Sequence, residues 1–176
     1  MKIGILMASI IYCFSCFGQQ VVDLNNSVNI DLPDGAKKIN NEQALSFVNK
    51  VFNNNKTVLN SISQRDSKNI YKVDNILVSF FTDNHSTNEG HLLEIKKGFD
   101  GLYKGDSTYT STIKKINNNA ILIIANSVNN LERCDFFCFN NSNTKAITGV
   151  LEYNKIDANE ASVVLNDIIN SIKFKK

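Results

Sequence analysis

The stretch TYTSTIKKINNNAILIIANSVNNLERCDFFCFNNSNTKAITGVLEY, residues 108–153, decides the fold predicted for this chain. It is divided by three asparagine clusters, at residues 117–119, 129–130 and 140–143. Asparagine tolerates the left-handed backbone that hairpin turns require, so each cluster is typical of a turn. The segments between them therefore predict an antiparallel meander of four strands, at residues 108–116, 120–128, 131–139 and 146–153.

Two of these strands are apolar on both faces. Residues 121–125 are unbroken apolar sequence, and residues 136–139 place three phenylalanines and one cysteine on alternating sides. A sheet that is buried on both faces needs a helical layer on each. We therefore expect an α+β fold of the α/β/α sandwich type, in which an antiparallel sheet of about six to seven strands is flanked by helices on both faces.

Three further strands are predicted ahead of the meander. Residues 27–32 alternate apolar and polar side chains, and Pro33-Asp34-Gly35 ends that strand. Residues 70–73 and 76–82, separated by Asp74-Asn75, are typical of a tight hairpin. The second arm is apolar on both faces and should be central in the sheet.

Helices are predicted on both sides of the hairpin and at the end of the chain. Apolar residues recur at helical spacing from Asn41, which can serve as the N-cap of a first helix. The pattern of residues 58–63 is ambiguous and predicts no particular secondary structure. Ser86 and Glu89 form a capping-box pattern before a second helix. Over residues 157–172, with Asp157 as N-cap, one apolar stripe predicts a third helix with a structural role, carried by Ala161, Val164, Leu165, Ile168, Ile169 and Ile172.

Length and composition exclude several classes of protein. The chain has 176 residues, of which 43% are apolar and 20% charged, and its formal net charge is +2. These values exclude a disordered chain, a polytopic membrane protein and a nucleic-acid binder that works by bulk positive charge. We expect one domain, residues 19–176, after an amino-terminal leader.

The leader is predicted from residues 1–18. Lys2 precedes an apolar run at residues 3–14. The segment Cys16-Phe17-Gly18 places small residues at the two positions that a signal peptidase recognises. The run is too short to span a bilayer, so no transmembrane span is expected in the mature chain. The protein is then periplasmic or secreted. In the alternative, Ser15-Cys16 ends a lipoprotein site and Cys16 carries a lipid anchor at the outer envelope, although Cys13 stands where such sites usually carry leucine.

Cys134 and Cys138 should be free and buried. Four residues of extended strand separate their Cα atoms by about 13 Å, whereas a disulfide requires less than about 7 Å.

Several short segments resemble the PsbP-like superfamily. They are Leu32-Pro33-Asp34-Gly35 after the first strand, Thr148-Gly149-Val150-Leu151-Glu152-Tyr153 in the last, and the terminal residues 165–174. The resemblance, which extends to bacterial envelope proteins of the DcrB type, implies an antiparallel sheet between helices and a scaffold used mostly for binding. Ala36 stands where the superfamily commonly has an aromatic residue. The resemblance carries over no catalytic residue.

The strongest candidate for a metal site is the window that holds both histidines. His85, His91, Asp83 and Glu89 offer imidazole and carboxylate ligands that suit Zn²⁺ or a similar ion. Their spacing matches no closed motif, and a capped helix following a solvated loop explains the same residues. No other cofactor is predicted.

The sequence therefore favours an exported, non-catalytic protein that acts as a binding or accessory subunit in a bacterial envelope, with another envelope protein as its partner. No nucleic-acid partner is expected, and contact with a membrane would come only through the possible lipid anchor. The alternatives are a metal- or small-ligand-binding periplasmic module centred on His85 and His91, and an envelope hydrolase, which the lack of a Gly-x-Ser-x-Gly motif disfavours.

Overall fold

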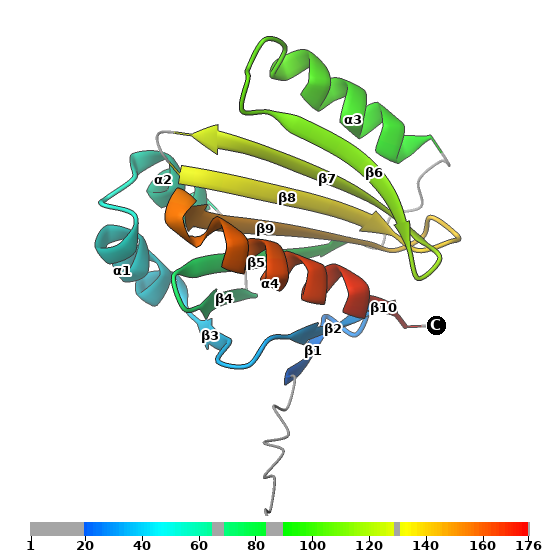
Figure 1. Ribbon diagram of the computed structural model, residues 1–176. Helices are drawn as coiled ribbons and strands as arrows, with labels where there is room; N and C mark the ends of the chain where they lie inside the picture. Colours follow the sequence, from blue (N-terminus) through cyan, green and yellow to red (C-terminus); the bar gives the residue numbers. More distant parts are fainter. Residues whose placement is uncertain (1–19, 65–68, 84–89, 129–130, 176) are drawn as a thin grey trace, which may run out of the picture.

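The computed structural model describes residues 20–64, 69–83, 90–128 and 131–175, which form two antiparallel sheets and four α-helices (Figure 1). The larger sheet has seven strands in the order β3-β4-β5-β9-β8-β7-β6, and the smaller has the order β1-β2-β10. The strands are β1 (Gln20–Leu24), β2 (Val28–Leu32), β3 (Lys37–Ile39), β4 (Ile70–Val73), β5 (Ile76–Asp83), β6 (Thr110–Ile116), β7 (Asn119–Val128), β8 (Leu131–Phe139), β9 (Ala146–Asn154) and β10 (Lys173–Phe174). The helices are α1 (Asn41–Val51), α2 (Lys56–Gln64), α3 (His91–Leu102) and α4 (Ala158–Ser171), with a short 3₁₀ turn at Lys155–Asp157.

The four-strand meander is confirmed as β6 to β9, each antiparallel to the next. Two of its turns use asparagine as expected, because Asn117, Asn118 and Asn143 all have positive φ angles, whereas the turn predicted at residues 129–130 lies outside the described residues. The hairpin of β4 and β5 is also confirmed, with Asp74 at a positive φ in its turn. β5 pairs with β9 on its other side, so it is central, and the sheet is continuous from β3 to β6.

The predicted strand at residues 27–32 forms as β2, but in the smaller sheet. There it pairs with β1 and with β10, neither of which was predicted. The seventh strand of the larger sheet is instead the three-residue β3. β3 and β10, with three and two residues, are too short to show a clear alternation, and β1 has adjacent valines in place of a strict alternation, which is why sequence periodicity misses them.

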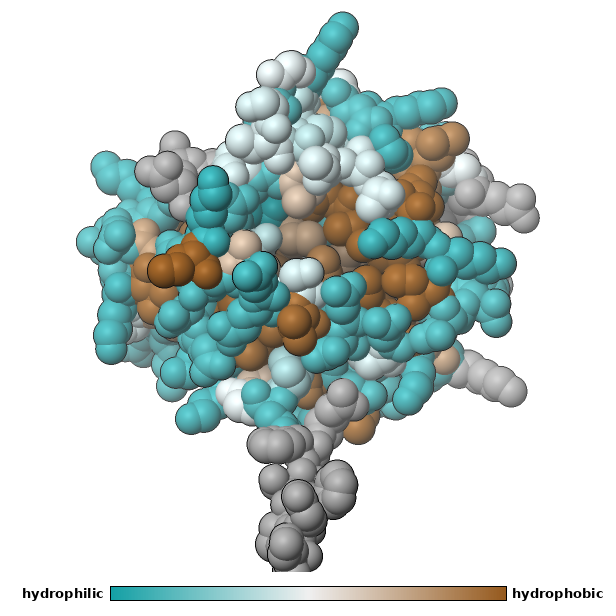
Figure 2. All heavy atoms as spheres, viewed as in Figure 1, coloured by the Kyte–Doolittle hydropathy of each residue, from teal (hydrophilic) through white to brown (hydrophobic). Residues whose placement is uncertain are grey.

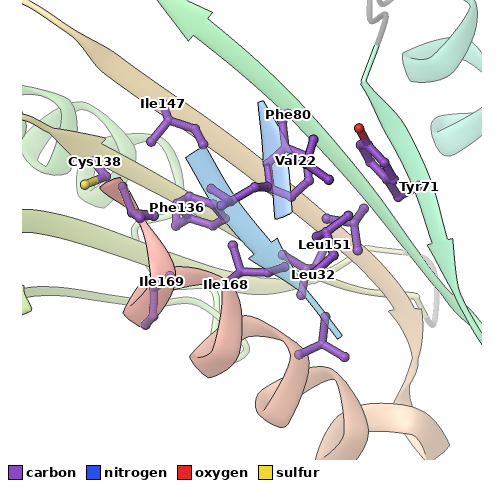
Figure 3. Packing of buried hydrophobic residues seen from close by; sticks show 14 of the residues in the cluster. Val22, Leu32, Tyr71, Phe80, Phe136, Cys138, Ile147, Leu151, Ile168 and Ile169 are labelled. Carbon is purple, nitrogen blue, oxygen red and sulfur yellow. The ribbon is translucent and has the colours of Figure 1, made fainter. Parts of the chain in front are cut away.

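One face of the larger sheet is covered by α4 and the smaller sheet (Figure 1). Figure 3 shows Phe136, Ile168 and Leu32 pointing toward one another from a meander strand, α4 and β2. The predicted structural role of the last helix is therefore confirmed. Asp157 is its N-cap residue, as expected, but its side chain makes no capping hydrogen bond. Figure 2 shows hydrophobic residues over the meander between α3 and α4. Ile123 of β7 packs against the core cluster beneath α4 and is only partly buried.

The opposite face is covered by α1, α2 and α3, so helices lie on both faces as predicted. The N-cap of α1 is Asn40, not Asn41: the Asn40 side chain accepts a hydrogen bond from Gln43 N–H, and the Gln43 side chain accepts one from Asn40 N–H. The ambiguous residues 58–63 lie within α2. Ser86 and Glu89 lie outside the described residues, and α3 begins at His91 after Gly90, with no side-chain cap.

Cys134 and Cys138 are free and buried, as predicted. Within the described parts of the chain, no helix has both the length and the apolar character needed to cross a bilayer.

Candidate ligand-binding cleft

A cleft of about 310 Å³ lies between α2 and α3, above strands β8 and β9. The two helices cover separate ends of the sheet face, α2 packing near Leu77 and Leu131 and α3 near Leu122 and Ile124. The cleft is lined by Asn55, Thr57, Val58, Phe99, Tyr103, Leu131, Arg133, Asp135 and Glu152.

Strand register brings the charged lining residues together. Alternate residues of a strand point to the same face, so Arg133 and Asp135 of β8 share one face. Glu152 lies directly opposite Arg133 on β9. The alternate residues of β8, Cys134 and Phe136, point to the other face, into the core beneath α4.

The three charged side chains form one ion-paired cluster. Arg133 Nε donates to Asp135 Oδ2 and Arg133 Nη2 donates to Asp135 Oδ1, both at 2.8 Å. Arg133 Nη1 lies 3.7 Å from Glu152 Oε1. The two carboxylates are deeply buried, since Asp135 is 6% exposed and Glu152 1%, whereas the Arg133 side chain retains 32%. A guanidinium held on two edges in this way has one defined orientation.

Desolvation alone would lower the pKa of Arg133, but its hydrogen bonds to Asp135 and its attraction to Asp135 and Glu152 outweigh that effect. The net result is a raised pKa, so the guanidinium remains charged in the cleft.

The wall contributed by α2 is the first turn of that helix. Asn55 Oδ1 accepts hydrogen bonds from the backbone N–H groups of Thr57, at 3.1 Å, and Val58, at 3.3 Å. Asn55 thus caps α2 and fixes the start of the helix beside the cleft.

The wall contributed by α3 is aromatic. The rings of Phe99 and Tyr103 are stacked, with centroids 6.3 Å apart, and Tyr103 also stacks on Tyr109 at 5.1 Å. Asp100 anchors this wall to β6, because it accepts hydrogen bonds from Tyr109 Oη at 2.8 Å and Ser111 Oγ at 2.6 Å. Lys96 Nζ donates to the same carboxylate at 2.6 Å.

This cleft was not predicted from the sequence. Its charged residues come from two strands, and no motif spacing connects them. The sequence feature that could have indicated the cleft is a charged residue between apolar neighbours in a predicted strand. Asp135 lies between Cys134 and Phe136, and Glu152 lies between Leu151 and Tyr153. Such a residue on the buried face of a sheet indicates either a structural ion pair or a site.

The predicted metal cluster is only partly within the described residues. Asp83 ends β5 and His91 begins α3, whereas His85 and Glu89 lie outside the described ranges. His91 Nδ1 is 3.6 Å from Glu94 Oε2, and its ring packs edge-on against Phe139 at 5.5 Å. The described residues contain no group of three potential ligands. The four-residue site therefore stays a prediction.

The two thiols are poor nucleophiles. Burial, which disfavours a thiolate, raises the pKa of both Cys134 and Cys138 to about 12, and the nearby Asp135 charge adds to the effect at Cys134.

Comparison with known proteins supports the fold at low sequence similarity. No family model and no curated protein matches the chain. Among solved structures, it is similar to the solution structure of the cyanobacterial PsbP protein, CyanoP, from Synechocystis sp. PCC 6803, with 9% identity and a TM-score of 0.53. The match covers 93% of this chain and 96% of that one. The predicted fold is thereby confirmed: the chain has a PsbP-like fold.

Proposed function

We propose that this protein is an exported, non-catalytic binding or accessory subunit of a bacterial envelope, and that its partner is another envelope protein. The observation that carries the proposal is the cleft between α2 and α3. Its guanidinium is oriented by two buried carboxylates on a rigid sheet. Groups fixed in this way are suited to recognition, because little ordering remains to be done when a ligand binds.

The same arrangement argues against catalysis at the cleft. A general acid or base must exchange a proton near neutral pH, whereas Arg133 is held charged by its partners. A nucleophilic cysteine needs a lowered pKa, whereas burial raises the pKa of both thiols. The resemblance to the PsbP-like superfamily favours the same conclusion, since it implies a scaffold used mostly for binding.

Export rests on the predicted leader. We expect cleavage after Gly18, which leaves a single domain of residues 19–176 in the periplasm or outside the cell. Intact-mass analysis of protein purified from the envelope tests this directly. A chain that begins at Gln19 supports free export, whereas a diacylglyceryl-modified Cys16 would replace it with the lipid-anchored form.

Cross-linked co-purification from the native envelope tests the accessory role. We expect one envelope protein to be recovered in near-stoichiometric amount, and no turnover of a panel of generic esters and glycans by the purified protein. Turnover that follows the protein through purification would contradict the proposal and favour the hydrolase.

A further inference from the structure

We propose that the outer edge of strand β6 binds an acidic, extended segment of the partner protein, which joins the larger sheet as an additional strand. This inference rests on the proposed accessory function, for which it specifies a contact surface and the chemistry of the partner. The surface is separate from the cleft, because no residue of β6 lines the cleft.

The edge is long, regular and accessible. β6 is the last strand of the larger sheet, and no described strand pairs with its outer edge (Figure 1). It has seven residues, no proline and an uninterrupted register with β7, whereas β3 at the opposite edge has only three residues. Residues 110 and 112–115 of β6 are exposed. An edge strand is a template for further pairing unless it is short, bulged or interrupted by proline, and β6 has none of these protections.

The turn between β6 and β7 determines which backbone groups point outward. The two asparagines of the turn, at residues 117–118, have positive φ, and the residues that flank them pair directly. The pair that flanks a two-residue turn exchanges both of its backbone hydrogen bonds, and along antiparallel strands bonded and non-bonded pairs alternate. The N–H and C=O groups that point away from β7 are therefore those of Ser111, Ile113 and Lys115.

The charge of the edge is basic. Lys114 and Lys115 are exposed, and neither β6 nor β7 contains an acidic residue. Successive residues of a strand face opposite sides of the sheet, so each face of the edge carries one of these lysines. On the side of Lys115, α3 adds the exposed Lys97, one turn from Asp100, whose carboxylate is already paired with Lys96. An incoming strand with carboxylates opposite Lys114 and Lys115 would gain an ion pair on each face, and such cross-strand pairs stabilise a sheet.

Apolar side chains lie beside the lysines. Ile113, at the middle of β6, is 41% exposed, and Leu93 of α3 is 50% exposed. Leu93 lies two turns before Asp100, which contacts Ser111, so Leu93 projects from α3 on the side of β6. Ser111 and Ile113 share one face of β6. An incoming strand with an apolar residue opposite Ile113 would cover part of this surface.

The lysines disfavour a second copy of the chain as the occupant. Two β6 strands paired antiparallel about Ile113 would bring four lysines into one short ladder, and the two Lys114 side chains would be diagonal neighbours on the same face. Side chains at diagonal positions are close enough to interact, and like charges in a ladder weaken pairing. Two lysines on the edge therefore select an acidic strand and reject a basic one.

The first test uses the mature protein labelled with ¹⁵N and three acetylated, amidated peptides. They are the acidic Thr-Glu-Glu-Val-Thr-Val-Thr, the basic Thr-Lys-Lys-Val-Thr-Val-Thr, and the acidic peptide with proline in place of its first valine. In antiparallel pairing, the glutamates lie opposite Lys115 and Lys114 and the first valine lies opposite Ile113. We expect the acidic peptide to bind with a dissociation constant of about 0.1 to 1 mM, and the other two at least about tenfold more weakly. Equal binding of the acidic and basic peptides, or no saturable binding of the acidic one, would overturn the inference.

Amide hydrogen exchange shows whether the peptide joins the edge. In the saturated complex the amides of residues 111, 113 and 115 should exchange at least about tenfold more slowly, because each gains a hydrogen-bonding environment. The amides of residues 112 and 114 already face β7 and should change less. Slowing that lacks this alternation would place the peptide elsewhere and overturn the inference.

Variants test the charge and the backbone separately. The double change Lys114→Glu with Lys115→Glu should reverse the preference, so that the basic peptide binds more tightly than the acidic one. Lys50→Glu is the matched control, because Lys50 is exposed on α1, which packs near β3 and β4, and its reversal should leave binding unchanged. Ile113→Pro removes one outward N–H and no bond to β7, so it should weaken binding at least about tenfold even where the double variant does not fold. An unchanged affinity in Ile113→Pro, or an unchanged preference in the folded double variant, would overturn the inference.

Cross-linking in the native envelope connects the edge to the partner. A zero-length carbodiimide reagent joins an amine only to a carboxylate in contact with it, so we expect links from Lys114 or Lys115 to an aspartate or glutamate of the partner. A partner that is recovered undiminished with the double variant would overturn the edge inference and leave the accessory function standing. Links between two copies of the chain through β6 would make the occupant a second copy and also overturn it. If no envelope protein is recovered, the accessory function fails, and the peptide experiments alone decide whether the edge binds acidic strands.

Discussion

At Gly149 the absence of a side chain makes room for a fully buried aromatic ring in the sheet's core. Gly149 of β9 lies directly opposite Phe136 of β8, and a Cβ atom added there would fall within the Phe136 ring. Phe136 is fully buried and packs edge-on against Phe80. The contact explains why glycine stands in the interior of β9, where it usually costs stability.

Gly149→Ala should therefore lower the free energy of unfolding by about 1 to 3 kcal/mol through overpacking. Gly98→Ala is the control, because nothing lies within 4 Å of its added Cβ, and alanine in α3 should raise stability by about 0.5 to 1 kcal/mol. Urea denaturation followed by tyrosine circular dichroism measures both. A Gly149→Ala protein as stable as wild type would show that Phe136 can move aside without cost.

At the scale of elements, Asp100 joins α3 to β6 through Tyr109 and Ser111. Hydrogen bonds from Lys96, Ser111 and Tyr109 lower the pKa of Asp100 to about 2, from an ordinary value of 3.8. Because the folded pKa is the lower one, the contribution of this carboxylate is complete above pH 3.8 and disappears as the pH falls toward 2.

The tyrosine near-ultraviolet signal should therefore change between pH 4 and 2 as Tyr103 and Tyr109 lose their fixed stacking, about 5.1 Å between ring centroids. The chain contains no tryptophan, so this signal comes from tyrosine and phenylalanine. Asp100→Asn should remove most of that transition. A transition of the same size in the variant would assign it to other carboxylates.

The last helix is the element whose removal should matter most. Ala161, Val164 and Ile168 are buried against the sheet, and α4 packs closely on β2. A chain that ends before Asp157 loses this layer together with β10, and exposes a broad apolar face of the meander. We expect the truncated protein to be insoluble on expression. A soluble truncation that melts cooperatively would contradict the three-layer account of the core.

At the scale of the whole molecule, the main architecture was predictable because its long elements are strongly patterned. In residues 108–153 strands and asparagine turns recur at regular spacing, and in α4 apolar residues recur at helical spacing. The structure agrees with both patterns. The second sheet was not predictable, because β1 and β10 gain their stability from pairing with β2 rather than from local pattern. The cleft was not predictable either, since its three charged residues meet only through the register of β8 and β9.

The closed core also governs cysteine chemistry. Cys134 and Cys138 lie on one buried face of β8 and, with a pKa of about 12, carry almost no thiolate at neutral pH. Native protein should resist iodoacetamide, whereas protein in guanidinium should take two carbamidomethyl groups at these positions. Protection that persists in denaturant, with an intact mass lower by two hydrogens, would reveal a disulfide and contradict the extended geometry of β8.

The pairing of β2 with β10 has a consequence for how the protein reaches its final form. Asn29 lies opposite Lys173, and Lys175 forms an ion pair with Asp23, so the earliest described strands are held by residues that follow α4 in the sequence. A polypeptide that emerges from a ribosome or a translocation channel with its amino end first lacks these partners until residues 173–175 have emerged. The smaller sheet is therefore completed only after every strand of the larger sheet has emerged, and in the interval before it closes the nascent chain is most accessible to proteases and chaperones.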